Sequence, residues 1–137
     1  MNTETPETSV RATRASRAAA IATAGGIQAA RDSGALPRYI DTTVSEALVL
    51  GLVAQGVRTF FSVFGHGSTE VGEVLRIYQA ADLVRVYGLR SELEASHAGA
   101  ALRWLTGEKA AVITSIGPGA LQALAASLVA AADGLGV

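Results

Sequence analysis

The chain has 137 residues, 50% of them hydrophobic, which suffices for the core of one ordinary domain, and its formal net charge of −1 argues against nucleic acid as a partner. Cysteine is absent, which excludes disulfide bonds, thiolate metal sites and thiol catalysis, and fits a reducing cytoplasm. The apolar stretches are interrupted before they reach the roughly 20 residues that cross a bilayer, so no membrane span is expected.

The N-terminal segment, residues 1–37, differs in composition from the rest of the chain. Thr, Ser, Arg and Ala dominate it, and the first aromatic residue is Tyr39. We therefore expect a flexible N-terminal arm followed by a domain that spans residues 38–137. An organelle transit peptide is the alternative, but acidic residues such as Glu4 and Glu7 do not fit that acid-poor class.

Within this arm, residues 14–31 contain good helix formers. Gly25 and Gly26 interrupt them, and the segment offers little apolar surface for packing. Only a marginal helix is expected there.

From residue 42 onward, helices and strands are predicted to alternate. Apolar residues at helical spacing over 44–57 predict a helix, and Thr43 with Glu46 forms a capping-box pattern at its start. The aromatic and β-branched residues at 59–64 then predict a buried strand.

The alternation continues to the end of the chain. The remaining predicted elements are a helix at 68–80 capped by Ser68 or Thr69, a strand at 83–87, a helix at 91–105, a strand at 110–114, and a last helix after the Gly117-Pro118-Gly119 turn. Because parallel strands need a crossover element, this order predicts an α/β fold with a parallel sheet flanked by helices. Residues 133–137 are expected to begin another strand, which implies a sheet truncated at the C-terminus.

Ligands of such sheets bind beyond the carboxyl ends of the strands, where we expect the loops 65–68, 88–92 and 115–119. Glu92 is the first candidate, because the first turn of a helix at this edge presents its side chain to a ligand. The alternative is that Glu92 only complements the helix dipole, a contribution of about 0.3 to 1 kcal/mol.

Three motifs occur along the chain in a recognisable order. Glu92 precedes the pair His97-Ala98 by five residues and Thr106-Gly107 by fourteen. A TSIGPGA turn lies at 114–120, and a strand with a glycine-containing turn lies at 61–67. Together these motifs resemble the N-terminal pyrimidine-binding domain of the acetolactate-synthase-like thiamine-diphosphate-dependent enzymes.

The resemblance covers residues 43–137 and implies the thiamine-diphosphate-binding fold. It implies that Glu92 is the catalytic carboxyl, which hydrogen-bonds a ring nitrogen of the aminopyrimidine and relays a proton. The residues it places at the cofactor are Gly65, His66, Glu92, Gly117, Pro118, Gly119 and Gln122. None of these is expected to bind a metal, because a separate domain would hold the diphosphate and its Mg2+.

The sequence Phe64-Gly65-His66-Gly67 is similar to that of the trihydroxycyclohexane-dione hydrolases of inositol breakdown, a subgroup of that family. This similarity implies cleavage or ligation of a carbon–carbon bond beside a carbonyl of a small substrate, with a cyclic dione as the most specific candidate and an acetolactate-synthase-like reaction next. The chain alone is expected to be inactive. A homodimer partner or a second protein carrying the diphosphate-binding domain would complete the site.

Two further classes of function stay open. Leu93 and Gln122 depart from the family pattern, which is compatible with a non-catalytic association subunit or a degenerate fragment. A Rossmann-like nucleotide binder is the third reading, but the GxGxxG fingerprint is missing. The Gly117-Pro118-Gly119 turn is also weak as a phosphate cradle, because no lysine follows it.

Other side chains have competing roles. His66 lies in a glycine-flanked turn, where contact with a substrate oxygen and simple solvation are equally plausible. His97 is rotated by roughly 140° from Glu92 around the helix and is expected to be packed or hydrogen-bonded. Glu94 is assigned to the capping box of Ser91. The small residues of the last two predicted helices suggest close packing, on the domain's own sheet or against another chain.

Overall fold

A computed structural model describes residues 6–132, with side chains from residue 8 onward, so the strand predicted at 133–137 lies outside the described residues. The elements follow in the order α1 (Pro6–Ala24), α2 (Ile27–Asp32), α3 (Val44–Ala54), β1 (Thr59–Ser62), a 3-10 turn η1 (His66–Ser68), α4 (Thr69–Ala80), β2 (Arg85–Gly88), α5 (Glu92–Thr106), β3 (Ala110–Ile113) and α6 (Pro118–Ala132).

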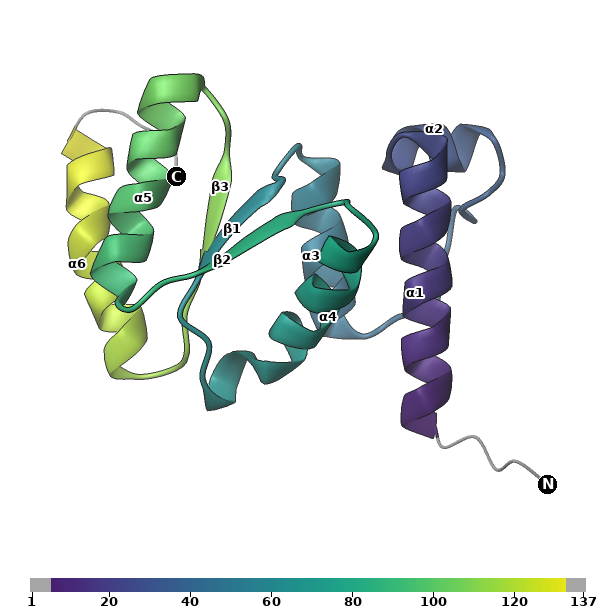
Figure 1. The fold of residues 1–137 in the computed structure, drawn as a ribbon, viewed down its shortest axis with the longest axis horizontal. Helices are drawn as coiled ribbons and strands as arrows, with labels where there is room; N and C mark the ends of the chain where they lie inside the picture. The colour runs from purple at the N-terminus through teal and green to yellow at the C-terminus, as the bar shows by residue number, and fades with distance from the viewer. Residues whose placement is uncertain (1–5, 133–137) are drawn as a thin grey trace.

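The three strands form a parallel sheet in the order β2-β1-β3, with Thr59 of β1 in register with Arg85 of β2 and Ala110 of β3. Helices α3 and α4 cover one face of the sheet, and α5 and α6 lie on the other, while α1 stands outside α4 (Figure 1). The predicted α/β fold with a parallel, helix-flanked sheet is confirmed.

Helix starts are set locally, as predicted, but only half of each capping box forms. The hydroxyl of Thr43 accepts from the Glu46 backbone N at 3.2 Å, and the hydroxyl of Ser91 accepts from the Glu94 N at 3.2 Å. Neither glutamate side chain returns a bond to its capping residue within the described part of the chain. The structural role predicted for the Glu94 carboxylate is therefore wrong, since only its backbone takes part.

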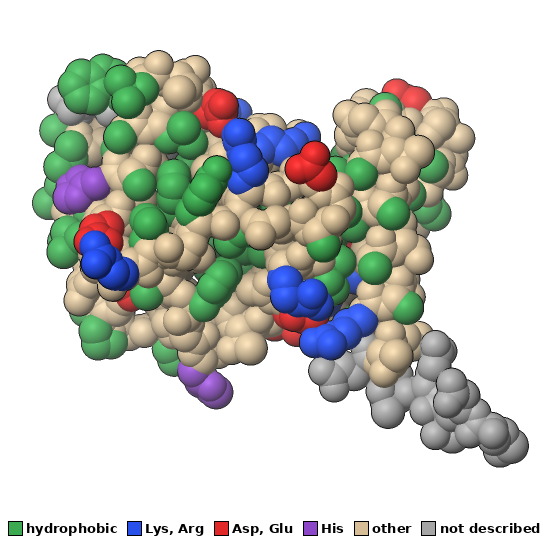
Figure 2. All heavy atoms as spheres, viewed as in Figure 1, with side chains coloured by type: hydrophobic (Ala, Val, Ile, Leu, Met, Phe, Trp, Pro, Cys, Tyr) green, Lys and Arg blue, Asp and Glu red, His purple; other side chains and the backbone are tan. Residues whose placement is uncertain are grey.

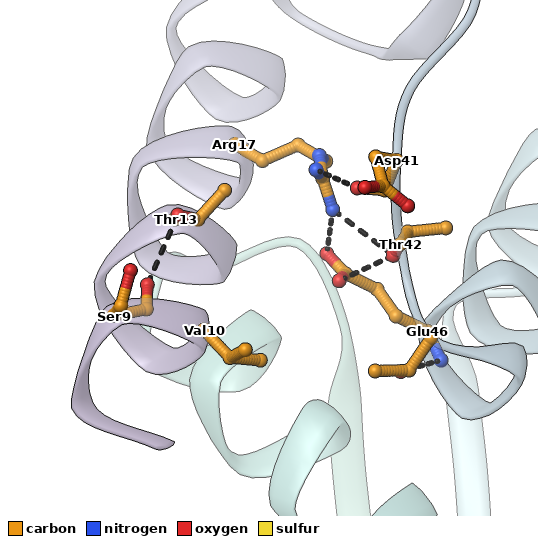
Figure 3. Close-up of a pocket in the computed structure, with 8 residues that line it drawn as sticks. Ser9, Val10, Thr13, Arg17, Asp41, Thr42 and Glu46 are labelled. Carbon is orange, nitrogen blue, oxygen red and sulfur yellow. Dashed lines mark hydrogen bonds and ion pairs between the residues drawn. The ribbon is translucent and has the colours of Figure 1, made fainter. Parts of the chain in front are cut away.

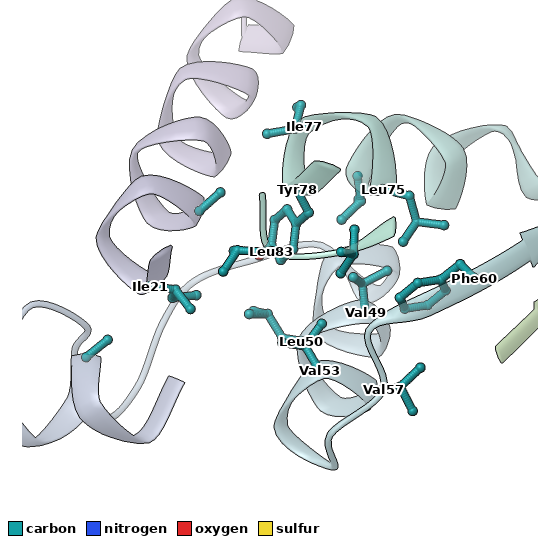
Figure 4. Packing of buried hydrophobic residues seen from close by; sticks show 14 of the residues in the cluster. Ile21, Val49, Leu50, Val53, Val57, Phe60, Leu75, Ile77, Tyr78 and Leu83 are labelled. Carbon is teal, nitrogen blue, oxygen red and sulfur yellow. The ribbon is translucent and has the colours of Figure 1, made fainter. Parts of the chain in front are cut away.

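The main hydrophobic core lies between the sheet and the pair α3–α4 (Figure 4). Phe60 of β1, Val49 of α3 and Leu75 of α4 are fully buried there. The same cluster extends to the N-terminal segment through Ala18 and Ile21, both fully buried. The opposite face of the sheet, under α5 and α6, is packed mainly by alanines.

The prediction of only a marginal helix within the N-terminal segment is wrong. Helix α1 has 19 residues and packs against α4, and α2 packs against α3. Gly25 and Gly26 do interrupt the helix, as predicted, and both have positive φ angles. The helix was underestimated because its stabilising contacts are made with residues distant in sequence, which local propensity does not contain.

Helix α1 is also held by a buried polar group, the Glu46 cluster. It consists of Arg14, Arg17, Thr42, Glu46 and Tyr78. The Glu46 carboxylate, 2% exposed, receives Arg17 at 2.6 Å, Thr42 at 2.6 Å, Tyr78 at 2.9 Å and Arg14 at 3.5 Å. Figure 3 shows Arg17 reaching from α1 to the carboxylate and to Thr42. A fully partnered buried charge of this kind fixes the place of α1 on α3.

The Glu46 cluster predicts a dependence of stability on acid pH. Burial raises the pKa of the Glu46 carboxyl, but hydrogen bonds from Thr42, Arg17 and Tyr78 and the charge of Arg17 outweigh it, so the pKa lies below its ordinary 4.5. Such a carboxyl stabilises the fold above its unfolded-state pKa, and this contribution is lost as the pH falls through the lowered folded-state pKa. The free energy of unfolding should therefore decrease as the pH falls below 4.5.

Urea unfolding at several pH values measures this decrease. The variant Glu46→Gln has no carboxyl to protonate at this position, so its unfolding free energy should change less with pH in the same range. An equal pH dependence for the wild type and this variant would contradict the assignment.

The two edges of the sheet differ. At the outer edge of β2, the backbone N–H of Val86 donates to the side-chain oxygen of Gln79 at 2.6 Å. At the other edge, β3 pairs only with β1 among the described strands, and a hollow of about 470 Å3 runs between β3 and α6. Five of its ten lining residues are alanines, and Leu52 and Leu124 are among the others.

Candidate cofactor site

The loops that follow the three strands lie together at the carboxyl edge of the sheet. Backbone bonds continue the pairing just past the strand ends, from Leu89 N to Ser62 O at 2.9 Å and from Val63 N to Ile113 O at 3.0 Å. The segments that carry His66, Glu92 and Gly119 therefore start from neighbouring points, as the strand order predicts.

The His66 loop packs directly against the turn that follows β3. A Cβ atom on Gly65 would lie 2.6 Å from the Cβ and Oγ atoms of Ser115, and one on Gly67 would overlap the side chain of Ile116. The N–H of Gly67 also points to the Ser115 hydroxyl, at 3.4 Å. Glycine is required at both positions because backbone here contacts the neighbouring loop without room for a side chain.

Glu92 opens α5 at the same edge, and its side chain lies over the first turn of α6. A Cβ atom built on Gly119 would meet the Glu92 side chain, with the carboxylate oxygen Oε1 as the nearest atom. Glu92 is half-buried, and no hydrogen bond or ion pair to its carboxylate is found within residues 6–132. This places a partly desolvated carboxylate with free acceptor capacity at the edge where ligands of such sheets bind.

Helices α5 and α6 pack side by side and hold this arrangement. One turn beyond Glu92, the hydroxyl of Ser96 donates to the backbone oxygen of Ala123 at 3.4 Å. Small buried residues, such as Gly99 and Ala126, let the two backbones approach closely.

The other residues proposed for the cofactor lie around this contact. Gly117 has a φ of 74°, which favours glycine, and Pro118 is the first residue of α6, as predicted. His66 and Gln122 are both exposed. The roles of these residues toward a ligand stay predictions.

His97 does not fit its prediction. It is exposed, and no hydrogen bond to it is found among the residues the structure describes. The buried side of α5 is formed instead by Ala95, Ser96 and Gly99, so the outward position of His97 follows from which face of the helix packs on α6.

Two serines of the site were missed or misread from the sequence. Ser68 is the N-cap residue of α4, but its buried hydroxyl accepts from the N–H of Gly65 at 3.1 Å and makes no capping bond. Ser115 links the His66 loop to the turn after β3 through the contacts described above. The glycines that face these hydroxyls were the available signal, because each marks a close approach.

A second hollow, of about 360 Å3, lies between α1 and the start of α3 (Figure 3). Arg17 and Glu46 line it and bind each other, and Arg17 also donates to the backbone oxygen of Asp41 at 3.0 Å. The Arg17 guanidinium and the Glu46 carboxylate are thus already paired within the fold.

The outer side of α5 and α6 exposes many large hydrophobic residues, seen as green patches over the left side of the molecule in Figure 2. The most exposed are Trp104, Leu105, Leu121, Leu124 and Leu128, at 65% to 82%. Neither these helices nor any other among residues 6–132 is long and apolar enough for a transmembrane span.

The sequence of this domain matches a model of a known protein family. A family model described as "Thiamine pyrophosphate enzyme, N-terminal TPP binding domain" matches residues 42–137, more than half of the chain. No curated protein and no solved structure gave a match. The division between arm and domain at residue 38 stays a prediction. The conserved-domain match and the parallel α/β sheet agree, so the chain belongs to the thiamine pyrophosphate enzymes, of which it contains the N-terminal cofactor-binding domain.

Proposed function

We propose that Glu92 is the catalytic carboxyl of this domain, which hydrogen-bonds a ring nitrogen of the cofactor's aminopyrimidine and moves a proton to and from it. One observation carries the proposal: the carboxylate is half-buried at the carboxyl edge of the sheet, lies against Gly119, and has no partner in the described structure. A carboxylate that only complemented the helix dipole would need neither the burial nor the glycine beside it.

The surroundings of Glu92 fit a flat heterocycle. Backbone of the glycine-containing loops lies at this edge, where Gly65 and Gly67 contact the turn after β3 and Gly119 contacts Glu92. Bound thiamine diphosphate supplies the carbon that attacks a carbonyl and then accepts the electrons of the broken carbon–carbon bond. Glu92 would hold its pyrimidine ring, and the backbone of residues 117–119 would lie beside that ring.

The diphosphate and Mg2+ are assigned to a separate domain. No group of three His, Asp or Glu side chains able to hold a metal ion is found in the described residues. Of the loops 65–68, 88–92 and 115–119, only 88–92 carries a lysine or arginine, Arg90, so this edge offers a diphosphate a single arginine. The chain would therefore be inactive alone and would contribute the pyrimidine half of a shared active site, in a cytoplasmic enzyme.

For the reaction, we propose cleavage or ligation of a carbon–carbon bond beside a carbonyl, with hydrolysis of a cyclic dione as the most specific candidate. The residues Phe64-Gly65-His66-Gly67 support this choice, as does the exposure of His66 next to the cofactor edge. An exposed imidazole in this loop is able to donate a hydrogen bond to a substrate carbonyl oxygen. An acetolactate-synthase-like reaction is the next candidate.

Proton exchange at the reactive carbon of the cofactor tests the function. The chain is combined with a partner that carries the diphosphate-binding domain, loaded with thiamine diphosphate and Mg2+, and exchange of the thiazolium proton into deuterated water is followed by NMR. Exchange much faster than for free cofactor supports catalysis. A complex that binds the cofactor without accelerating exchange would support the second candidate, a non-catalytic association subunit, which the departures at Leu93 and Gln122 favour.

The exposed apolar face of α5 and α6 is proposed as the surface that meets the partner, either a second copy or the protein with the diphosphate-binding domain. Leu124→Glu places a charge on this face and should weaken association at least about 10-fold, because the interface would then bury a carboxylate without a partner. Val44→Glu makes the same change at a residue 88% exposed on α3 and is the matched control.

Sedimentation velocity of the chain, alone and mixed with the partner, measures this association. Equal weakening by both variants, or none by either, would contradict the assignment of the α5–α6 face.

A further inference from the structure

We propose that Gly119 is a positioning residue for Glu92, because the missing Cβ at Gly119 provides the space in which the Glu92 carboxylate lies. The inference rests on the proposed role of Glu92 and adds what places its carboxylate. In the proposed function the backbone of Gly119 would also lie beside the pyrimidine ring, whereas this inference concerns only the space at its Cα, which acts through the Glu92 carboxylate.

The space beside Gly119 is filled by one side chain. A Cβ atom built on Gly119 would overlap Oε1 of Glu92 and lie 3.2 Å from its Cδ and 3.6 Å from its Cγ. These three atoms are the nearest neighbours of that position, and all belong to Glu92. Outside its own helix, the atoms nearest to a Cβ at this position are therefore those of the Glu92 side chain.

Backbone conformation does not explain this glycine. Gly117, two residues earlier, has a φ of 74°, in the left-handed region that favours glycine. Gly119 has no such angle and lies in the first turn of α6, where alanine is accommodated without strain. What excludes a side chain at Gly119 is the neighbouring carboxylate.

The two helices cannot easily move apart to make room. Glu92 faces Gly119 and Ser96 faces Ala123, so the same offset of 27 residues is kept over one full turn of α5 and α6. Each helix is also fixed at its start, α5 by the Ser91 cap and α6 by the turn at Gly117. In Gly119→Ala, the flexible end of the Glu92 side chain should move, while both backbones stay in place.

The test compares Gly119→Ala with Gly51→Ala. Gly51 is a glycine within α3, and a Cβ there would meet nothing within 4 Å, so it controls for the general effect of alanine in a helix. Both variants of the 137-residue chain should fold with thermal midpoints at or above the wild-type value. A lower midpoint for Gly119→Ala alone would mean that the backbone gives way, which would overturn the inference.

The position of the carboxylate is measured without cofactor. In the wild type, an NMR nuclear Overhauser effect is expected between the side-chain Hγ protons of Glu92 and the Hα protons of Gly119. The Glu92 carboxyl carbon resonance should shift in Gly119→Ala and stay unchanged in Gly51→Ala. Absence of the Overhauser effect, or an unchanged resonance in Gly119→Ala, would overturn the inference.

The functional consequence is measured in the assembled, cofactor-loaded protein. Gly119→Ala should slow proton exchange at the cofactor by about 100-fold, because misplacing a reacting group by about 1 Å costs a factor of this order. In a Glu92→Asp background, where the side chain is shorter by one methylene and leaves room for a Cβ, adding Gly119→Ala should change the rate by less than about 3-fold, since the two changes act on one contact.

Additive effects of the two substitutions would overturn the positioning role. Failure of the proposed function has a different signature, an exchange rate that does not respond to the loss of the Glu92 carboxyl at all. If exchange requires Glu92 but ignores Gly119→Ala, the function stands and this inference falls.

Discussion

Replacement of Glu92 by glutamine is expected to slow proton exchange at the cofactor by about 10²- to 10⁴-fold, the range that general acid–base groups contribute. Glutamine has nearly the shape of glutamate, so it should still fit against Gly119, but it cannot accept and return a proton. Assembly with the partner and the affinity for thiamine diphosphate should change little by comparison.

Glu94→Gln is the matched control for this result. It removes the same charge from the first turn of the same helix, but Glu94 is exposed and its carboxylate makes no bond in the described structure. The exchange rate of this variant should stay within about 5-fold of the wild type, because a surface charge at a helix terminus contributes at most about 1 kcal/mol. An unchanged rate in Glu92→Gln, or equal losses in both variants, would remove Glu92 from its assigned role.

Replacement of Arg14 by methionine is expected to cost about 3 kcal/mol of unfolding free energy, the lower end of the range for breaking a buried ion pair. The Arg14 side chain is 2% exposed, contacts Glu46, and also reaches Glu70 of α4 at 2.7 Å. Methionine preserves most of the packing but leaves the buried Glu46 carboxylate with one guanidinium fewer. The loss should not be larger, because Arg17 remains beside Glu46 at 2.6 Å.

Arg11→Met makes the same change one turn earlier in α1, at a side chain 53% exposed and paired with Glu73 at 2.8 Å. An exposed ion pair of this kind contributes about 0 to 1 kcal/mol. Urea unfolding of both variants and the wild type gives the two losses, provided that the slope of free energy against urea stays constant. Equal losses would contradict the buried role of Arg14.

The sequence predicts the elements of this fold where the causes are local. The N-terminal caps at Thr43 and Ser91, the proline at the start of α6 and the alternation of helix with strand depend on residues a few positions apart, and the structure confirms them. Glu46 was read as a local capping residue. Two of the partners of its carboxylate, Arg14 and Tyr78, each lie 32 residues away, and no periodicity in the sequence connects them to it.

The candidate site shows the same limit. The order of the elements predicts the place of the site at the carboxyl edge, and the family motifs in the sequence predict the role of Glu92. The contact between Glu92 and Gly119 joins residues in two different helices, and it depends on how deeply α5 and α6 approach each other. The distance between α5 and α6 depends on how small side chains such as Ser96 and Ala126 pack. The sequence shows that these residues are small, but it does not show how they pack.

The two edge strands of the sheet, β2 and β3, differ in how open they are to pairing with a further strand. The side chain of Gln79 accepts the hydrogen bond of the outward Val86 N–H, so this N–H is not free to pair with an added strand. Edge strands in many proteins are protected against unwanted pairing in this way. Among residues 6–132, no side chain is found to bond the outer main chain of β3 in this way, and the hollow of about 470 Å3 lies beside it. We therefore expect a polypeptide that extends this sheet, from this chain or another, to pair with the outer edge of β3.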